Sequence, residues 1–143
     1  MLEIRIMDPR WAKKVNNIDT LLQKAFECCL EAKKAEFSVV LTDDEFMRAL
    51  NKNYRGKDAP TNVLSFNYTN EQIGVGIIGE VILSFDRLVI EALENEIKFE
   101  DHLLHMFIHG VLHVLGYDHS SDEETLTMEK KEEEILEKLA LLG

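Results

Sequence analysis

The stretch HGVLHVLGYDH, residues 109–119, decides how the chain around it must fold. His109 and His113 are four residues apart, so on a helix their side chains share one face, about 5–6 Å apart. A continuing helix would carry His119 about 9 Å farther along the axis and onto a different face. Gly116 permits a turn, because glycine accepts a left-handed backbone conformation at low cost. We therefore predict a helix that ends near Gly116 and a turn that brings a third imidazole to the first two.

Three imidazoles in this arrangement are typical of a catalytic zinc site, which keeps its fourth position open. Such an ion can lower the pKa of bound water to around 7 or hold an anionic phosphate oxygen. We predict one zinc ion held by His109, His113 and His119, and we expect His113 to belong to the catalytic group as well. His102 and His105 are expected to be structural or solvated, since no turn delivers a third partner to His105 and His109.

Gly110 stands where zinc proteases with the HExxH motif carry a glutamate, the general base of their reaction. Its absence disfavours peptide hydrolysis, and the glycine is expected to leave space beside the ion. Phosphodiester cleavage is less demanding, because the ion and a cationic side chain can stabilise the phosphate charge while water or a 2′-hydroxyl attacks. An amide hydrolase or protease with a displaced base is the alternative that the ligand spacing alone suggests.

The rest of the chain predicts the α+β class, with a mixed sheet, largely antiparallel in content, of about four strands packed by about five helices. Alternating or continuous apolar residues predict strands at residues 2–7, 37–41, 63–68 and 80–84. Helical periodicity predicts helices at residues 17–35, 43–53, 84–95, 100–115 and 121–142, of which 100–115 is the zincin-like metal helix. The Gly-rich segment 69–79 is expected to join an antiparallel pair.

Local signals mark the ends and faces of two of these helices. Thr42 and Ser121 each precede a glutamate by three residues, which predicts two capping boxes. The last helix should turn apolar side chains towards a core: Leu126, Ile135, Leu136 and Leu139. Its Glu-rich remainder, including Glu132, is expected to be a solvated face.

The composition indicates one compact domain, residues 1–143, because 143 residues of which 45% are apolar can bury a single core. No apolar run approaches the roughly 20 residues of a membrane span, and the N-terminus lacks the apolar centre of a signal peptide. We therefore expect a cytoplasmic protein, with Cys28 and Cys29 reduced.

Charge is distributed unevenly along the chain. Residues 1–70 contain 11 basic and 10 acidic residues, a net charge of +1, whereas residues 71–143 contain 5 and 17, a net charge of -12. A polyanion would meet the first half more readily, since phosphate binding depends on local cations. The overall charge of -11 argues against a general nucleic-acid coat protein.

Three segments, YRGKDAPTNVLSF, GEVILS and HGVLHVLGYDH, resemble in order and spacing the YbeY family of metal-dependent endoribonucleases, also called rRNA maturation factors. The resemblance covers nearly the whole chain. It implies a single-strand-specific endoribonuclease in rRNA processing, notably 16S rRNA 3′ end maturation, and in ribosome quality control, with ribosomal particles as partners. It also implies that the three histidines are zinc ligands and that Arg55 is important for activity. Asn67 departs from the family, which usually has proline there.

Several further side chains carry expectations about the site. Arg55 can clamp two phosphate oxygens with its permanently charged guanidinium, and Lys52 and Lys57 extend a cationic track for RNA, as Arg48 can. Asp118 either orients a ligand imidazole or caps the turn after Gly116. A ribosome-binding module with a structural zinc ion is the non-enzymatic alternative.

Overall fold

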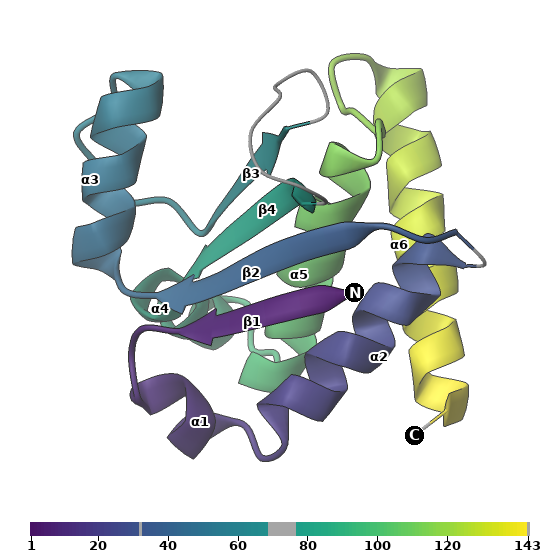
Figure 1. The fold of residues 1–143 in the computed structure, drawn as a ribbon, viewed down its shortest axis with the longest axis horizontal. Coiled ribbons are helices and arrows are strands. Elements are labelled where there is room, and N and C mark those ends of the chain that lie inside the picture. Colours follow the sequence, from purple (N-terminus) through teal and green to yellow (C-terminus); the bar gives the residue numbers. More distant parts are fainter. Residues whose placement is uncertain (32, 69–76, 143) are drawn as a thin grey trace.

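The computed structural model describes residues 1–31, 33–68 and 77–142, which contain a four-stranded mixed sheet (Figure 1). The strands are β1 (Leu2–Ile6), β2 (Glu36–Thr42), β3 (Val63–Asn67) and β4 (Ile77–Ser84), in the spatial order β1-β2-β4-β3. β2 runs parallel to β1 and β4, whereas β3 pairs antiparallel with β4. The predicted α+β class, the mixed sheet and the antiparallel pair are confirmed, but the sheet is not largely antiparallel, because two of its three strand pairs are parallel. Residues 69–76 of the predicted Gly-rich connection lie outside the described residues.

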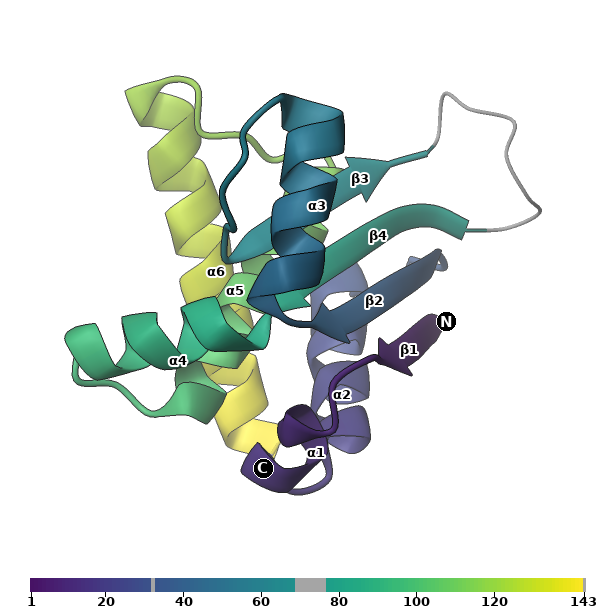
Figure 2. The same ribbon diagram turned by 90° about the vertical axis from the view of Figure 1, so that its left-hand side faces the viewer.

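Six helices accompany the sheet within these residues: α1 (Arg10–Lys14), α2 (Ile18–Leu30), α3 (Asp44–Arg55), α4 (Phe85–Glu94), α5 (Phe99–Val114) and α6 (Asp122–Leu142). α5 packs on β3 and β4 and α2 on β1, and α6 packs outside them against α2 and α5 (Figures 1 and 2). α3 lies against the opposite face of the sheet, where its Met47 contacts alternate strand residues in a smaller core. None of the described helices is long and apolar enough to cross a membrane.

α1 is the helix that periodicity did not predict, because five residues are too few to show a helical pattern. Tertiary contacts hold it in place. The indole of Trp11 is completely buried, packs edge-on against Phe85, and donates a hydrogen bond of 3.0 Å to the backbone oxygen of Thr42. One buried tryptophan thus fixes a helix that its local sequence does not specify.

The ends of α3 and α6 show one wrong and one confirmed capping prediction. Thr42 is buried in β2, and Asp43 caps α3 instead by accepting a hydrogen bond of 2.9 Å from the Phe46 N–H. Ser121 caps α6 as predicted, since its Oγ accepts a hydrogen bond of 3.1 Å from the Glu124 N–H.

The buried face of α6 contains Met128 in place of the predicted Leu126. Leu126 is 54% exposed, whereas Met128 is 2% exposed. Ile135 is buried as predicted, and Leu136 and Leu139 pack partly against the core. Met128 and Ile135 therefore define the face of α6 that turns inward.

Candidate metal centre

The three histidines of residues 109–119 come together at the C-terminal end of α5. α5 ends at Val114, Gly116 has a φ of +111°, and the chain reverses before α6 begins (Figure 1). The ring centroids are 6.4 Å apart for His109 and His113, 5.7 Å for His109 and His119, and 5.6 Å for His113 and His119. The turn and the convergence that the spacing predicts are both present.

Hydrogen bonds at Nδ1 orient two of the three rings. Nδ1 of His113 is 3.0 Å from the backbone oxygen of Tyr117, and Nδ1 of His109 is 2.7 Å from Oε2 of Glu132. A carbonyl or carboxylate oxygen only accepts, so each Nδ1 donates its proton, and in the neutral imidazole Nε2 then keeps a lone pair. Histidines that bind metals commonly donate their other ring N–H in this way. Both rings therefore have the tautomer of an Nε2 ligand.

This donor set fits a zinc ion in chemistry and nearly in spacing. In a tetrahedral site with Zn–N distances of about 2.0–2.1 Å, ring centroids stand roughly 5 Å apart. The observed separations are somewhat larger, and in the part of the chain that the structure describes no three His, Cys, Asp or Glu side chains already form a metal-binding group. A bound ion would have to draw the three rings closer together. His119 can move towards the other two, because its side chain is 54% exposed and lies in a loop.

Glu132 is the residue of the site that the sequence interpretation missed. It is 5% exposed, contrary to the expected solvated face, and it faces α5 from α6. Burial raises the pKa of its carboxyl, but hydrogen bonds with His105 and His109 outweigh this effect and bring the pKa down to about 2. The signal for it lay in the helical spacing, since position 132 falls between Met128 and Ile135 on the buried stripe.

His102 and His105 have the structural role expected of them. His102 is buried, and its Nε2 lies 2.8 Å from Oε1 of Glu91. Nε2 of His105 lies 3.0 Å from Oε1 of Glu132, and this hydrogen bond is the largest cause that raises the pKa of His105. His105 thus reaches the metal centre only through Glu132.

Gly110 does not face the metal centre, which corrects the expectation that it leaves space beside the ion. It is buried against the sheet, and a Cβ atom there would lie 2.7 Å from Cγ1 of Val81 and 3.1 Å from Oγ of Ser65. Position 110 is about 100° around the helix from His109, and this turns it towards β3 and β4. The glycine is required by helix–sheet packing, and a glutamate there would collide with the sheet.

β3 holds the end of the metal helix through two side chains on its α5 face. Ser65 donates from Oγ to the backbone oxygen of Gly110 over 3.1 Å, and Asn67 donates from Nδ2 to that of Val114 over 2.9 Å. The second bond satisfies a carbonyl at the helix end. A proline at position 67 would have no side-chain donor for this contact.

Asp118 is engaged mainly in the turn. Its Oδ1 accepts a hydrogen bond of 2.7 Å from the backbone N–H of His119, and its Oδ2 accepts one of 3.3 Å from Oγ of Ser120. Nδ1 of His119 lies 4.0 Å from Oδ1, which is longer than a hydrogen bond. The hydrogen bonds of Asp118 therefore support its role in capping the turn. Its role in orienting a ligand imidazole stays a prediction.

A cleft of about 660 Å³ opens beside the histidines, between α5 and α6. Its lining is acidic around His105, His109 and His119, and the carboxylates come from Glu129, Glu132 and Glu133. Phosphate groups would be repelled from this cleft, since no basic side chain other than histidine is among the described residues that line it. RNA is therefore expected to reach the histidines from another side.

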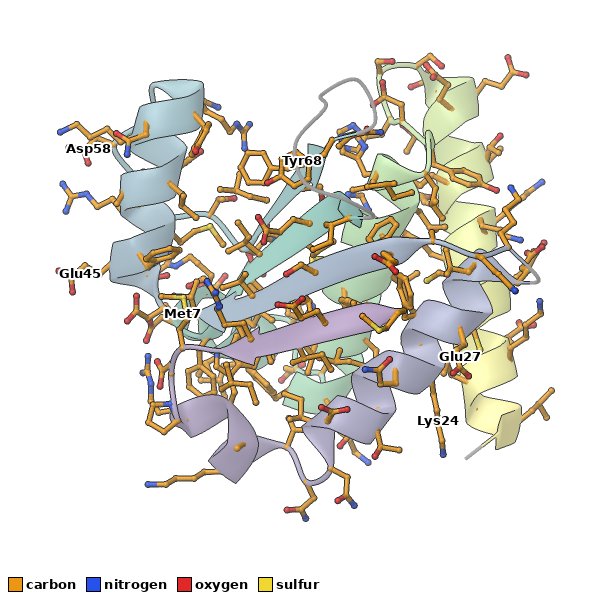
Figure 3. The ribbon with its side chains drawn as sticks, in the orientation of Figure 1. Met7, Lys24, Glu27, Glu45, Asp58 and Tyr68 are labelled. Atoms are coloured by element: carbon orange, nitrogen blue, oxygen red, sulfur yellow. The ribbon has the colours of Figure 1, made fainter. Side chains whose placement is uncertain are left out.

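The basic residues of the predicted track lie on α3 and just after it. Arg55 is the last residue of α3, on the sheet face opposite to α5. The end of α3 and the turn after α5 both lie at the upper edge of the two ribbon views, on opposite sides of Figure 1 (Figures 1 and 2). Arg48 is held at 2.7 Å by Asp58, which lies on the outer side of α3 (Figure 3). Among the described residues, no side-chain hydrogen bond or ion pair engages Arg55, Lys52 or Lys57.

Aromatic rings extend from the end of α3 across β3. Tyr54 is 67% exposed, and its ring centroid is 5.3 Å from that of Phe66. Phe66 and Tyr68 have parallel rings with centroids 6.3 Å apart, and Tyr68 lies between α3 and α5 in the side-chain view (Figure 3). This Tyr54–Phe66–Tyr68 row starts beside Arg55 and points towards the end of the sheet at which the histidines lie.

The chain is similar to known proteins along nearly its whole length. The family model described as Endoribonuclease YbeY matches residues 3–140. A protein of Neorickettsia sennetsu named Endoribonuclease YbeY is 88% identical over 143 residues and is covered completely, as is the chain. A protein of that name from Anaplasma marginale is 39% identical, with 99% of the chain and 94% of the relative covered. The solution structure of TM1509 from Thermotoga maritima has a TM-score of 0.69 at 28% identity, covering 97% of the chain and 89% of that protein.

Proposed function

The chain belongs to the YbeY endoribonuclease family, and from this premise we propose that it cleaves single-stranded ribosomal RNA with one zinc ion held by His109, His113 and His119. It is thus a hydrolase of RNA phosphodiester bonds that acts in rRNA processing. The observation that carries the zinc proposal is the convergence of three imidazoles, two of which have Nδ1 hydrogen-bonded and Nε2 available. Bound there, zinc supplies a Lewis acid that stabilises negative charge on a phosphate oxygen.

The chain's own residues have separate tasks in this proposal. The Nε2 atoms of the histidines would hold the ion, and the side chains of His113 and His119 are exposed, so a polymer can approach them. Arg55 has a permanently charged guanidinium that is available to neutralise charge developing on the phosphate. The attacking oxygen is water or the substrate's 2′-hydroxyl. A 5′-phosphate on the product indicates water, and a cyclic phosphate indicates the 2′-hydroxyl.

The Tyr54–Phe66–Tyr68 row supports single-strand specificity. In a duplex the faces of the bases are stacked on one another, whereas in a single strand they can stack on aromatic side chains. The row begins beside Arg55, and the segment from Phe46 to Lys57 contains four basic residues and no acidic one. Bases and phosphates of one unpaired strand can therefore be bound together along this surface.

We further propose maturation of the 16S rRNA 3′ end on ribosomal particles as the biological task, together with ribosome quality control, which places the protein in the cytoplasm where ribosomes are assembled. The amide-hydrolase alternative loses support, because position 110 faces the sheet and has no room for the general base of a zinc protease. The carboxylates of the cleft beside the histidines favour an approach of RNA from the side of α3 instead.

RNA cleavage by the zinc-loaded protein and by the His113→Ala variant tests the central proposal. The variant should lose at least roughly 100-fold in cleavage rate on a single-stranded oligonucleotide, because Lewis-acid stabilisation is worth several kcal/mol. Equal rates would show that the metal centre does not carry the activity, and a contaminating nuclease would then be the simpler source.

Arg55→Ala, compared with Arg48→Ala, tests the phosphate clamp. Loss of a charge-assisted hydrogen bond costs about 1.5–3 kcal/mol, so kcat/KM for RNA should fall roughly 10- to 100-fold in Arg55→Ala. Arg48→Ala removes the same charge from the same helix, but its guanidinium is already engaged by Asp58. If kcat/KM falls equally in both variants, Arg55 contributes only its positive charge and does not bind a particular phosphate.

A further inference from the structure

Glu132 occupies an unusual place on α6. It lies four residues after Met128 and three before Ile135, and all three side chains are buried on the face that packs on α5. An apolar residue in such a stripe packs without the desolvation cost of a carboxylate. The hydrogen bonds of a buried carboxylate at this position therefore indicate a role other than packing.

Those contacts are two hydrogen bonds, one for each carboxylate oxygen. Oε2 lies 2.7 Å from Nδ1 of His109, and Oε1 lies 3.0 Å from Nε2 of His105. His105 and His109 are one helical turn apart on α5, so the carboxylate spans two successive turns of the metal helix. Because an ionised carboxylate only accepts, both imidazoles must donate to it.

The two hydrogen bonds have different consequences for the two rings. Donation from Nδ1 leaves Nε2 of His109 free of this contact, in a ring whose centroid is 6.4 Å from that of His113 and 5.7 Å from that of His119. Donation from Nε2 of His105 leaves that ring outside the group of three. His105 therefore fixes the carboxylate, and the carboxylate fixes the ring of His109.

We infer that Glu132 is the positioning residue of the metal centre: it holds His109 in the orientation and tautomer in which Nε2 binds zinc, and His105 anchors it from behind. The zinc part of this inference rests on the proposed function, whereas the tautomer part does not. His113 is oriented by the backbone oxygen of Tyr117, which no side-chain substitution removes. The orientation of His109 consequently depends on Glu132, a side chain of α6, whereas that of His113 depends on the backbone.

Glu132→Gln and Glu133→Gln form a matched pair for the test. Both remove one negative charge from neighbouring positions of α6, but the Glu133 side chain is exposed and makes no hydrogen bond among the described residues. Circular dichroism and thermal unfolding establish that each variant is folded. If Glu132→Gln does not fold, His105→Ala replaces it, since the His105 side chain is 44% exposed and its removal releases one anchor of the carboxylate.

The first measurement is the tautomer of His109 in metal-free protein, read from long-range proton–nitrogen NMR spectra of its ring. The unaltered protein and Glu133→Gln should show a proton on Nδ1 and none on Nε2. Glu132→Gln should show a mixture of the two forms, because an amide at position 132 can donate as well as accept. An unchanged His109 tautomer in Glu132→Gln overturns the inference, whether or not the protein binds zinc.

The second measurement is zinc affinity, by competition with a chromophoric chelator at constant pH. Glu132→Gln should bind zinc about 10- to 100-fold more weakly, and His105→Ala a few-fold more weakly, while Glu133→Gln should equal the unaltered protein. Equal affinity in Glu132→Gln and Glu133→Gln contradicts the positioning role. If the unaltered protein binds no zinc, the proposed function fails, and the tautomer measurement alone then decides the role of Glu132.

Discussion

A Cβ atom at position 110 would lie 2.7 Å from Cγ1 of Val81, closer than packed carbon atoms approach. Alanine normally stabilises a helix interior by about 1 kcal/mol relative to glycine. Here the collision outweighs that gain, so Gly110→Ala should lower the free energy of unfolding by about 1–3 kcal/mol. Urea denaturation measures this directly.

Val81→Ala removes the colliding methyl groups and provides the control for Gly110→Ala. The double variant should be more stable than the sum of the two single changes predicts, by about 1 kcal/mol. Strict additivity would mean that α5 shifts away from the sheet as a body. His109 and His113 would keep their spacing in such a shift, because both lie on α5, whereas the contact of His109 with Glu132 on α6 would change.

The sequence could predict the histidines but not the residue that holds one of them. His109, His113 and His119 lie within eleven positions, and helix geometry with one glycine turn is enough to relate them. Glu132 is 23 positions from His109, and their contact depends on how α6 docks on α5. A run of glutamates is usually solvated, and only tertiary packing shows which one is buried.

At the scale of elements, two turns with positive φ end α3 and α5. Gly56 has a φ of +69° and Gly116 a φ of +111°, and an added Cβ atom would meet nothing within 4 Å at either position. The cost of alanine is therefore backbone strain alone, about 1–2 kcal/mol at each. Both Gly56→Ala and Gly116→Ala should lower the unfolding temperature.

Only one of these two turns positions a histidine. Gly116→Ala displaces His119, so zinc affinity should fall by about tenfold or more, whereas Gly56→Ala should leave it unchanged. Chelator competition on both variants separates this effect from general destabilisation. A fall of zinc affinity in both, in proportion to lost stability, would remove the specific role of the turn at Gly116.

The strands and the longer helices follow from local periodicity, because each carries several turns or alternations of pattern. The order of the strands does not. β4 lies between β2 and β3, and this position is fixed by long-range contacts of Val39 and Val81 with the helices on one face and Ile82 on the other. α1 likewise depends on Trp11 and the cavity that receives it. Such contacts join segments that are far apart in the sequence, so a local sequence pattern cannot predict them.

At the scale of the molecule, an ion-pair network joins α1, α3 and α4. Arg10 binds Asp8 at 2.7 Å and Asp86 at 2.9 Å, and Asp86 also accepts a hydrogen bond of 2.9 Å from the Asp44 N–H. The hydrogen bonds from Arg10 are the largest cause that lowers the pKa of Asp8 and of Asp86. A lowered folded-state pKa contributes stability above the unfolded value, and that stability is lost as the pH falls through the folded value.

Asp86→Asn should therefore reduce stability most near neutral pH, by about 0.5–1.5 kcal/mol, and progressively less as the pH falls through the lowered folded-state pKa of Asp86. Urea denaturation at a series of pH values measures the difference. Glu94→Gln, an exposed change in the same helix, should have little effect at any pH. A deficit in Asp86→Asn that is the same at pH 7 and pH 2 would show that its charge is not involved.

The two ends of the long axis carry opposite charge. α3, with Lys52 and Arg55 and followed by Lys57, lies at one end and the Glu-rich α6 at the other (Figure 1). Each phosphate contact in a single-stranded complex contributes about 0.7 to the slope of log affinity against log salt concentration. Two lysines that contact phosphates should therefore contribute about 1.4 to that slope.

Fluorescence anisotropy of a labelled RNA with metal-free protein, which avoids cleavage, tests this distribution. The Lys52→Gln/Lys57→Gln double variant should bind RNA more weakly and with a slope smaller by about 1.4. Lys130→Gln/Lys138→Gln on α6 makes the same change of net charge and should leave the slope unaltered, because the carboxylates around those lysines repel the strand. If both double variants lower the slope equally, RNA does not bind preferentially along α3. Binding near the acidic cleft between α5 and α6 would then be indicated instead.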